Sequence, residues 1–356
     1  MTLRDAKRLF DIAVRLQVYV EGVKANQSSE FHDVLFNVDT EFRKLLGRVK
    51  YDTLDGLSKA ELNRLIVTLR TSQSKVYSAY VNKVIKQLQD FMQACLTVNR
   101  VAYTSAFLPL GEDDEPQILS DEKASELIEQ ESERNNFVPI FGLAAILIGS
   151  DKLWPRIANE PMGANGALLL PFLKSFSASA QLSIENLVRK GYSNGWTAAQ
   201  TQREMTAQLN KIANQADAVL STAMQHVSSA VAVGVQSSLW GKYRWVSVID
   251  NGTTEICLSR NGKVYRYGEG PVPPAHIRCR STTIPYNAAH DNETFYAWIK
   301  RQPLRTQNFA LGKKLADLLR SGKVKAKDLV RLANPTPLTI AQFKKAGIEI
   351  ITGEAP

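Results

Sequence analysis

The stretch "RWVSVIDNGTTEICLSRNGKVYRYGEGPVPPAHIRCRSTTIP", residues 244–285, differs in character from the helix-forming sequence that precedes it. Its first residues are aromatic and β-branched, which favours a strand, and "STTIPY" at 281–286 predicts a further short strand. The pair Asn261-Gly262, between "ICLSR" and "KVYRY", is typical of a two-residue hairpin turn. We therefore predict a small β-hairpin module over residues 243–290.

The same stretch contains polar side chains that can meet in space. A zinc ion takes four nitrogen, sulfur or oxygen ligands, but the residue three positions after Cys257, where a second cysteine would complete the pattern, is Arg260. A disulfide between Cys257 and Cys279 is a second possibility. We favour a third interpretation, a hydrogen-bonded structural knot without metal or other cofactor. Its members are Asp250, Cys257, His276, Cys279 and Arg280.

Catalysis is a weaker interpretation of these residues. Cys279 stands between Arg278 and Arg280, and neighbouring cations lower the pKa of an exposed thiol, while His276 can serve as its base. A zinc or thiol hydrolase centred on Cys257, His276 and Cys279 therefore stays open as an alternative. The sequence has no phosphate-binding glycine loop and no His-Glu-x-x-His helix. We predict that the chain is not an enzyme.

The sequence before residue 243 predicts helices. Apolar residues recur at three- and four-residue spacing, which gives each helix one apolar seam. Asn194-Gly195 predicts the end of one helix, and Thr197 with Gln200 forms a capping box that predicts the start of the next. The seams consist of Leu9, Ile12, Leu16, Tyr19 and Val23; of Tyr77, Val81, Val84, Leu88, Phe91 and Cys95; and of Leu209, Ile212, Ala216, Leu220, Ala223, Val227 and Val231.

The expected fold class is mainly α with a small α+β module. The net charge is +9, unevenly distributed: ten acidic and two basic residues lie between 112 and 134, and twelve basic and three acidic residues between 296 and 350. We therefore divide the chain into five parts. They are a helical bundle (1–110), an acidic linker (111–136), a helical region (137–242), the hairpin module (243–290) and a basic helical tail (291–356).

Two segments suggest partners. The basic tail favours a polyanionic partner such as double-stranded DNA, or an acidic protein surface, and a solvated helical face is the other interpretation of the same charges. The segment "FVPIFGLAAILIG", residues 137–149, is uncharged but too short to cross a bilayer, so it is either a buried segment or a transient membrane contact. The tail's candidate DNA-binding residues are Lys313, Lys314, Arg320, Lys323, Lys325, Lys327 and Arg331.

Residues 244–285 resemble the signature of the phage Mu F-type minor head proteins, the phage head morphogenesis family. The pattern runs from a tryptophan-containing strand through an aspartate, a threonine and a cysteine to a glycine-lysine turn, a proline-rich turn, a histidine and a Cys-Arg pair. These residues are Trp245, Asp250, Thr253 or Thr254, Cys257, Gly262, Lys263, Pro271, Pro274, His276, Cys279 and Arg280. Residues 296–329 look like the tail of such proteins, so the resemblance extends from about Leu168 to the C-terminus.

The resemblance implies a structural minor head protein of a tailed bacteriophage. Such a protein is made in the host cytoplasm and carried in the virion head near the portal vertex, in several copies. The implied partners are the portal and the major capsid protein, and the implied roles are head assembly and genome ejection. An ejected virion protein that contacts DNA is the alternative function.

Overall fold

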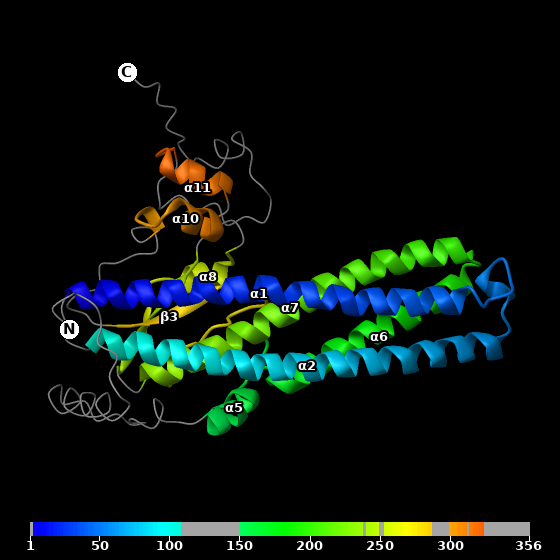
Figure 1. The fold of residues 1–356 in the computed structure, drawn as a ribbon, viewed down its shortest axis with the longest axis horizontal. Coiled ribbons are helices and arrows are strands. Elements are labelled where there is room, and N and C mark those ends of the chain that lie inside the picture. The colour runs from blue at the N-terminus through cyan, green and yellow to red at the C-terminus, as the bar shows by residue number, and fades with distance from the viewer. Residues whose placement is uncertain are drawn as a thin grey trace, which may run out of the picture.

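The computed structural model describes residues 3–107, 150–237, 240–248, 253–286, 299–311 and 313–323. Four long helices form an elongated body: α1 (Leu3–Leu46), α2 (Lys59–Phe107), α6 (Leu169–Ser193) and α7 (Ala198–Ser237). Figure 1 shows α1 and α2 running along the longest axis of the molecule, with a small sheet near the end where the chain starts. The shorter α5 (Ser150–Asn159) packs against α2, α6 and α7. The predicted fold class, mainly α with a small α+β module, is confirmed.

The apolar seams of α2 and α7 meet in one core. All six predicted seam residues of α2 and all seven of α7 are buried there, Cys95 among them. In α1, Leu16 and Val23 are partly buried, while the side chains of Leu9, Ile12 and Tyr19 lie outside the described set. The core runs from Val20 through α2, α5 and α6 to Trp240. Helices on both sides of the predicted acidic linker therefore share one core, and the five-part division stays a prediction.

Two turns meet at the end of the body opposite the sheet. A 3-10 turn, Leu54–Gly56, lies in the connection from α1 to α2, and its Leu54 amide donates to the Trp196 carbonyl at 2.9 Å. Gly195, at φ +60°, terminates α6 in the left-handed conformation that the sequence predicts. The capping box is also confirmed, because the Gln200 amide donates to Thr197 Oγ1 and the Thr197 amide donates to Gln200 Oε1.

The module contains three antiparallel strands in the order β2-β1-β3. They are β1 (Lys242–Ser247), β2 (Val264–Arg266) and β3 (Ser281–Pro285), and β1 pairs with both neighbours. The strand predicted at "ICLSR" is wrong, because these residues form the short helix α8 (Glu255–Arg260). A short apolar run does not distinguish strand from helix by periodicity, and Glu255 in the first turn favours the helix.

The Asn261-Gly262 turn therefore joins a helix to a strand. Asn261 has φ −57° and ψ 126° and Gly262 has φ +81°, which is type II geometry and not the type I′ geometry that Asn-Gly usually adopts in two-residue hairpins. The two neighbouring backbone bonds, from Gly262 N to Trp245 O and from Trp245 N to Lys263 O, still pair this turn with β1. Gly262 therefore lies in a turn, as predicted, but the element before the turn is helix α8 and not a strand.

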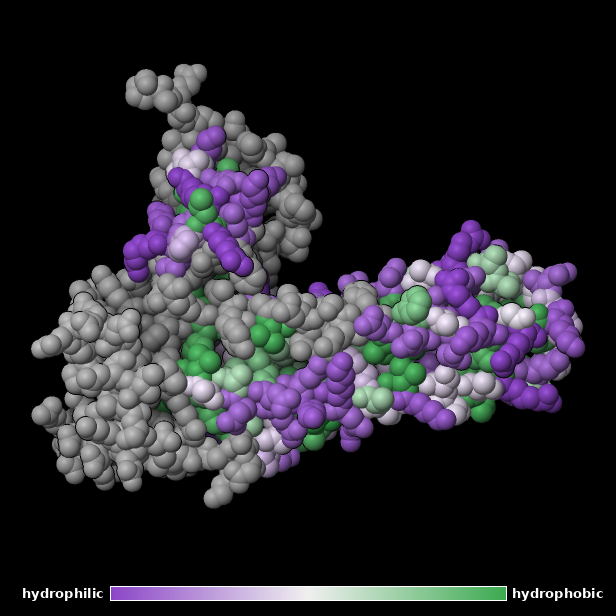
Figure 2. Space-filling model, in the orientation of Figure 1, coloured by the Kyte–Doolittle hydropathy of each residue, from purple (hydrophilic) through white to green (hydrophobic). Residues whose placement is uncertain are grey.

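The described part of the tail contains two short helices, α10 (Leu304–Leu311) and α11 (Lys313–Arg320), and Gly322 at φ +69° follows the second. They stand apart from the long helices in Figure 1, and hydrophilic side chains gather over them in Figure 2. The acidic linker and the apolar segment 137–149 lie outside the described residues.

One described helix, α7, is long and apolar enough to span a membrane by length and composition. Most of its apolar window is buried inside the protein, and its seam residues belong to the core. The length and hydropathy of α7 are therefore explained by its packing in the core.

Candidate functional site

Three of the predicted knot residues come together. Cys257 is on α8, and His276 and Cys279 lie in the loop between β2 and β3. Cys257 Sγ lies 3.1 Å from His276 Nε2 and 3.7 Å from Cys279 Sγ, and these three atoms all lie within 4.8 Å of one another. Arg280 follows directly and is partly buried, while Asp250 lies outside the described residues. The five-residue knot therefore stays a prediction, although the side chains of Cys257, His276 and Cys279 form one cluster.

Two serines that sequence reasoning missed support the cluster. Ser281 Oγ donates to Cys257 Sγ at 3.2 Å, and Ser247 Oγ lies 3.0 Å from Ser281 Oγ and donates to the Cys257 carbonyl. Trp245 Nε1 donates to Ser247 Oγ at 2.9 Å. The sequence contained a signal for Ser247, because side chains alternate along a strand and Ser247 therefore lies on the same buried face as Trp245. Strand register then places Ser281 directly opposite Ser247.

The loop that carries His276 and Cys279 is tied to the sheet and to α7. Tyr243 Oη donates to the Pro271 carbonyl at 2.6 Å, just before the cis peptide between Pro273 and Pro274. Arg278 has φ +60°, which is uncommon for a residue with a side chain. Three contacts of Arg278 with α7 hold this conformation. Its amide donates to Thr222 Oγ1, and its guanidinium donates to Asn214 O and pairs with Asp217.

The imidazole of His276 is oriented by its own backbone. Nδ1 lies 2.8 Å from the Ile277 carbonyl, which can only accept, so Nδ1 carries a proton and donates. Nε2 then faces Cys257 Sγ. The Cys279 amide also donates to the His276 carbonyl at 3.1 Å, which closes the turn between the two side chains. The loop thus presents one sulfur and one ring nitrogen toward the sulfur of α8.

A buried polar network joins the cluster to α1 and α7. Lys24 Nζ donates to Glu21 at 2.6 Å, to Gln225 Oε1 at 2.8 Å and more weakly to the Cys279 carbonyl at 3.5 Å. Gln225 Nε2 donates to the Ser281 carbonyl at 3.0 Å. Burial lowers the pKa of Lys24, against the opposing effect of Glu21. The network thus places the Lys24 side chain next to the loop that carries Cys279.

The two thiols ionise very differently. The pKa of Cys279 is lowered to about 3, first by its hydrogen bond with the Cys257 thiol and then by hydrogen bonds with His276 and the backbone, against the opposing effect of burial. The pKa of Cys257 is raised because its proton is held by Cys279 and because it is buried. Interaction with Cys279 raises the pKa of His276. The cluster therefore favours a thiolate at Cys279, which can bind a metal ion, accept hydrogen bonds or react with an electrophile.

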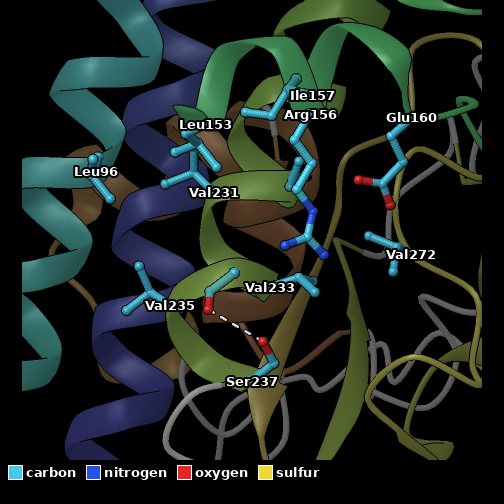
Figure 3. A pocket seen from close by; sticks show the side chains of 12 residues that line it. Leu96, Leu153, Arg156, Ile157, Glu160, Val231, Val233, Val235, Ser237 and Val272 are labelled. Atoms are coloured by element: carbon cyan, nitrogen blue, oxygen red, sulfur yellow. Dashed lines mark hydrogen bonds between the residues drawn. The ribbon is translucent and has the colours of Figure 1, made fainter. Parts of the chain in front are cut away.

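The thiolate of Cys279 is buried in the part of the chain that the structure describes. The Cys279 side chain belongs to a residue that is 0% exposed, and it packs with Trp245, Cys257 and Ala275. The cavity in Figure 3 lies elsewhere, between α2, α5 and α7, with Leu96, Arg156 and Glu160 in its lining. Its volume is about 60 Å³, far below the several hundred Å³ of ordinary ligand pockets. Neither the burial of Cys279 nor the small volume of this cavity favours the hydrolase alternative.

The predicted DNA-binding residues divide into three groups. Lys313, Lys314 and Lys323 are exposed on or after α11. Arg320 is used within the tail, because its guanidinium donates to Gln307 and Asn308 of α10 and pairs with Asp317. The remaining three lie outside the described residues; they are Lys325, Lys327 and Arg331.

Comparison with known families places this site in a wider group. Residues 182–284 match the family model described as "Phage Mu protein F like protein". The matched region begins within α6 and contains α7, β1, α8, β2, the site loop and nearly all of β3. No match was found among curated proteins or among solved structures. Over residues 182–284, the chain is therefore similar to the phage Mu F-like proteins, a family of phage head morphogenesis.

Proposed function

We propose that this chain is a structural minor head protein of a tailed phage that acts in head assembly near the portal vertex. The observation that carries the proposal is the family match over residues 182–284, which includes both a long helix and most of the sheet module. The two parts are joined by α7, which supplies core residues along its length and also holds the site loop and β3. A rigid helical body with a docked module is suited to assembly contacts.

The long helices offer surfaces for such contacts. Large apolar side chains are exposed on three of them: Phe36 is 70% exposed on α1, Val67 is 57% exposed on α2 and Leu182 is 57% exposed on α6. Single exposed apolar residues are ordinary on a soluble protein, so a partner has to be tested directly. The partners that fit the proposal are the portal, the major capsid protein and further copies of this chain.

The first experiment locates the chain. A phage with a stop codon early in this reading frame should give fewer or misassembled heads, and supplying the wild-type chain in trans should restore them. Mass spectrometry and cryo-electron microscopy of wild-type particles should find the chain at the portal vertex in several copies. Wild-type heads and precursor heads that both lack the polypeptide would refute the proposal.

The second experiment tests the helical surface. Phe36→Asp should reduce incorporation into heads at unchanged helicity, because it puts a charge on an exposed apolar position. The matched control is Asn37→Asp, which adds the same charge at the neighbouring exposed position on α1. Equal incorporation of both variants and wild type would exclude a contact at Phe36.

A second candidate function is contact with packaged DNA through the basic tail. The supporting observations are the net charge of residues 296–350 and the exposure of Lys313, Lys314 and Lys323. Duplex binding should weaken steeply with salt, and replacing Lys313 and Lys314 together by alanine should reduce the logarithmic salt slope by about 2. Replacing the exposed Lys174 and Lys211 instead should leave the slope unchanged. Binding that is independent of salt would exclude this function.

A further inference from the structure

We propose that Cys257, His276 and Cys279 form a zinc site that fastens α8 to the loop between β2 and β3. On sequence alone, the missing second cysteine at Arg260 disfavoured zinc. The structure provides what the spacing did not, a third ligand brought close by the fold. Two sulfurs and one imidazole nitrogen form a ligand set that zinc prefers over harder divalent ions.

Two distances between the proposed ligand atoms are close to those of a tetrahedral zinc ion, and all three atoms lie within 4.8 Å of one another. With zinc–sulfur bonds of about 2.3 Å, two sulfurs of a tetrahedral site lie about 3.8 Å apart. The sulfurs of Cys257 and Cys279 lie 3.7 Å apart. With a zinc–nitrogen bond of about 2.0 Å, sulfur and nitrogen lie about 3.5 Å apart. Cys257 Sγ and His276 Nε2 lie 3.1 Å apart, so a shift of a few tenths of an ångström accommodates the ion.

The imidazole is already oriented as a ligand. Histidines that bind metal usually donate their second ring nitrogen to a carbonyl or carboxylate, which fixes the tautomer and the ring plane. His276 does this through Nδ1 and the Ile277 carbonyl, 2.8 Å away. The lone pair of Nε2 is thereby directed toward the two sulfurs.

The fourth position and the charge balance can both be satisfied. Ser281 Oγ lies 3.2 Å from Cys257 Sγ, so its hydroxyl or a water held by it can complete the tetrahedron. Arg260 does not occupy this space as a ligand, and its guanidinium lies over the Trp245 ring, 5.3 Å from the ring centre. Two thiolates, a neutral imidazole and a divalent cation sum to zero charge, and burial of a neutral group costs far less than burial of separate charges.

A disulfide explains the same residues less well. It would require the sulfurs to approach to about 2.05 Å and would remove the partner of His276 Nε2. The zinc ion, in contrast, uses all three side chains and cross-links a three-stranded unit that is too small to be stabilised by its own core. Because Cys279 has no exposed surface, the ion's role is structural.

Metal analysis of the untagged full-length protein, purified without chelator under reducing conditions, tests the proposal. We expect about one zinc per chain, and we expect replacement by Co²⁺ to give the intense near-ultraviolet absorption of thiolate–cobalt bonds. Cys257→Ala, Cys279→Ala and His276→Ala should each lower zinc affinity at least tenfold and weaken or remove that absorption. The matched control, Cys95→Ala, removes the chain's third cysteine from the helical core and should retain the metal.

Two further measurements test the proposal even if a variant of one of the proposed ligand residues does not fold. The wild-type protein, stripped of metal by a chelator, should regain thermal stability on addition of zinc and not on addition of magnesium. Ser281→Ala, which keeps all three proposed ligands, should weaken zinc binding about tenfold or more. Unchanged metal content in the Cys257→Ala/Cys279→Ala variant would overturn the proposal, as would a metal-free wild type with two free thiols or a Cys257–Cys279 disulfide by mass spectrometry.

Discussion

Arg70 and Glu185 form an ion pair whose two members differ sharply in exposure. Two hydrogen bonds of 2.6 Å join the guanidinium to the carboxylate, but the Arg70 side chain is 55% exposed and that of Glu185 is 6% exposed. The hydrogen bonds from Arg70 lower the pKa of Glu185. Removal of the arginine therefore leaves a poorly hydrated carboxylate, whereas removal of the carboxylate leaves an arginine that water can solvate.

We predict that Arg70→Gln costs about 1–3 kcal/mol of unfolding free energy and that Glu185→Gln costs clearly less. Urea denaturation at neutral pH measures both, and the double variant gives the coupling energy between the two side chains. Equal costs for the two single variants would show that the difference in exposure has no energetic consequence.

His226 is a buried histidine on α7 that links two helices. Its Nε2 lies 3.0 Å from the Ile157 carbonyl on α5, and burial lowers its pKa, against opposing effects of that carbonyl and of Glu160. The folded protein therefore binds this proton less readily than the unfolded chain, whose histidine titrates near 6.5. The contribution of His226 to the free energy of unfolding is therefore fully present above about pH 7. It is lost as the pH falls through 6.5 toward the lower pKa that His226 has in the folded protein.

His226→Asn should flatten the fall of unfolding free energy between pH 7.5 and pH 5.5. Denaturant titrations of wild type and variant at both values provide the measurement. His276, whose pKa is raised, contributes with the opposite sign in both proteins, so the difference between them isolates His226. A variant with the same or a steeper pH dependence would contradict the assignment of a neutral buried imidazole.

At the scale of elements, the connection from α6 to α7 depends on one glycine. Gly195 has φ +60°, and a Cβ there would lie 3.1 Å from a carboxylate oxygen of Asp55 in the neighbouring connection. Gly195→Ala should destabilise the protein by about 1 kcal/mol or more, through backbone strain and this contact. Gly262 offers a matched control without the contact, since its φ is +81° and nothing lies within 4 Å of its Cβ position. Thermal unfolding of both variants should show a larger loss for Gly195→Ala.

The sequence predicted those elements whose conformation depends on residues close to one another in the chain. The α7 seam, the Thr197 capping box and the Gly195 terminus were all predictable, because each depends on residues within about two turns of one another. Helix α8 was not, since six residues with mixed propensity take their conformation from the sheet on which Cys257 packs. The same limit explains the site, where the residue types were recognised but the 3.7 Å approach of Cys257 and Cys279 depends on strand register and loop course.

In the whole molecule, one side chain connects three parts of the chain that are distant in sequence. Gln225 of α7 accepts from Lys24 of α1, exchanges hydrogen bonds with Gln17 of α1 and donates to the Ser281 carbonyl at the start of β3. Every one of these bonds is buried, so loss of the amide would leave donors and acceptors that water cannot reach. The helical body and the sheet module are thus coupled through a polar contact as well as through apolar packing.

Gln225→Leu, which preserves size, should therefore cost about 2–4 kcal/mol of unfolding free energy and should loosen the module more than the helices. Native-state hydrogen exchange should show faster exchange in β1, β3 and α8, with little change in the part of α2 that packs against α6. Asn210→Leu, at an exposed position on the same helix, provides the control for added apolar surface. If exchange in the module stayed at the wild-type rate while global stability fell, the coupling would run through the helical core and not through Gln225.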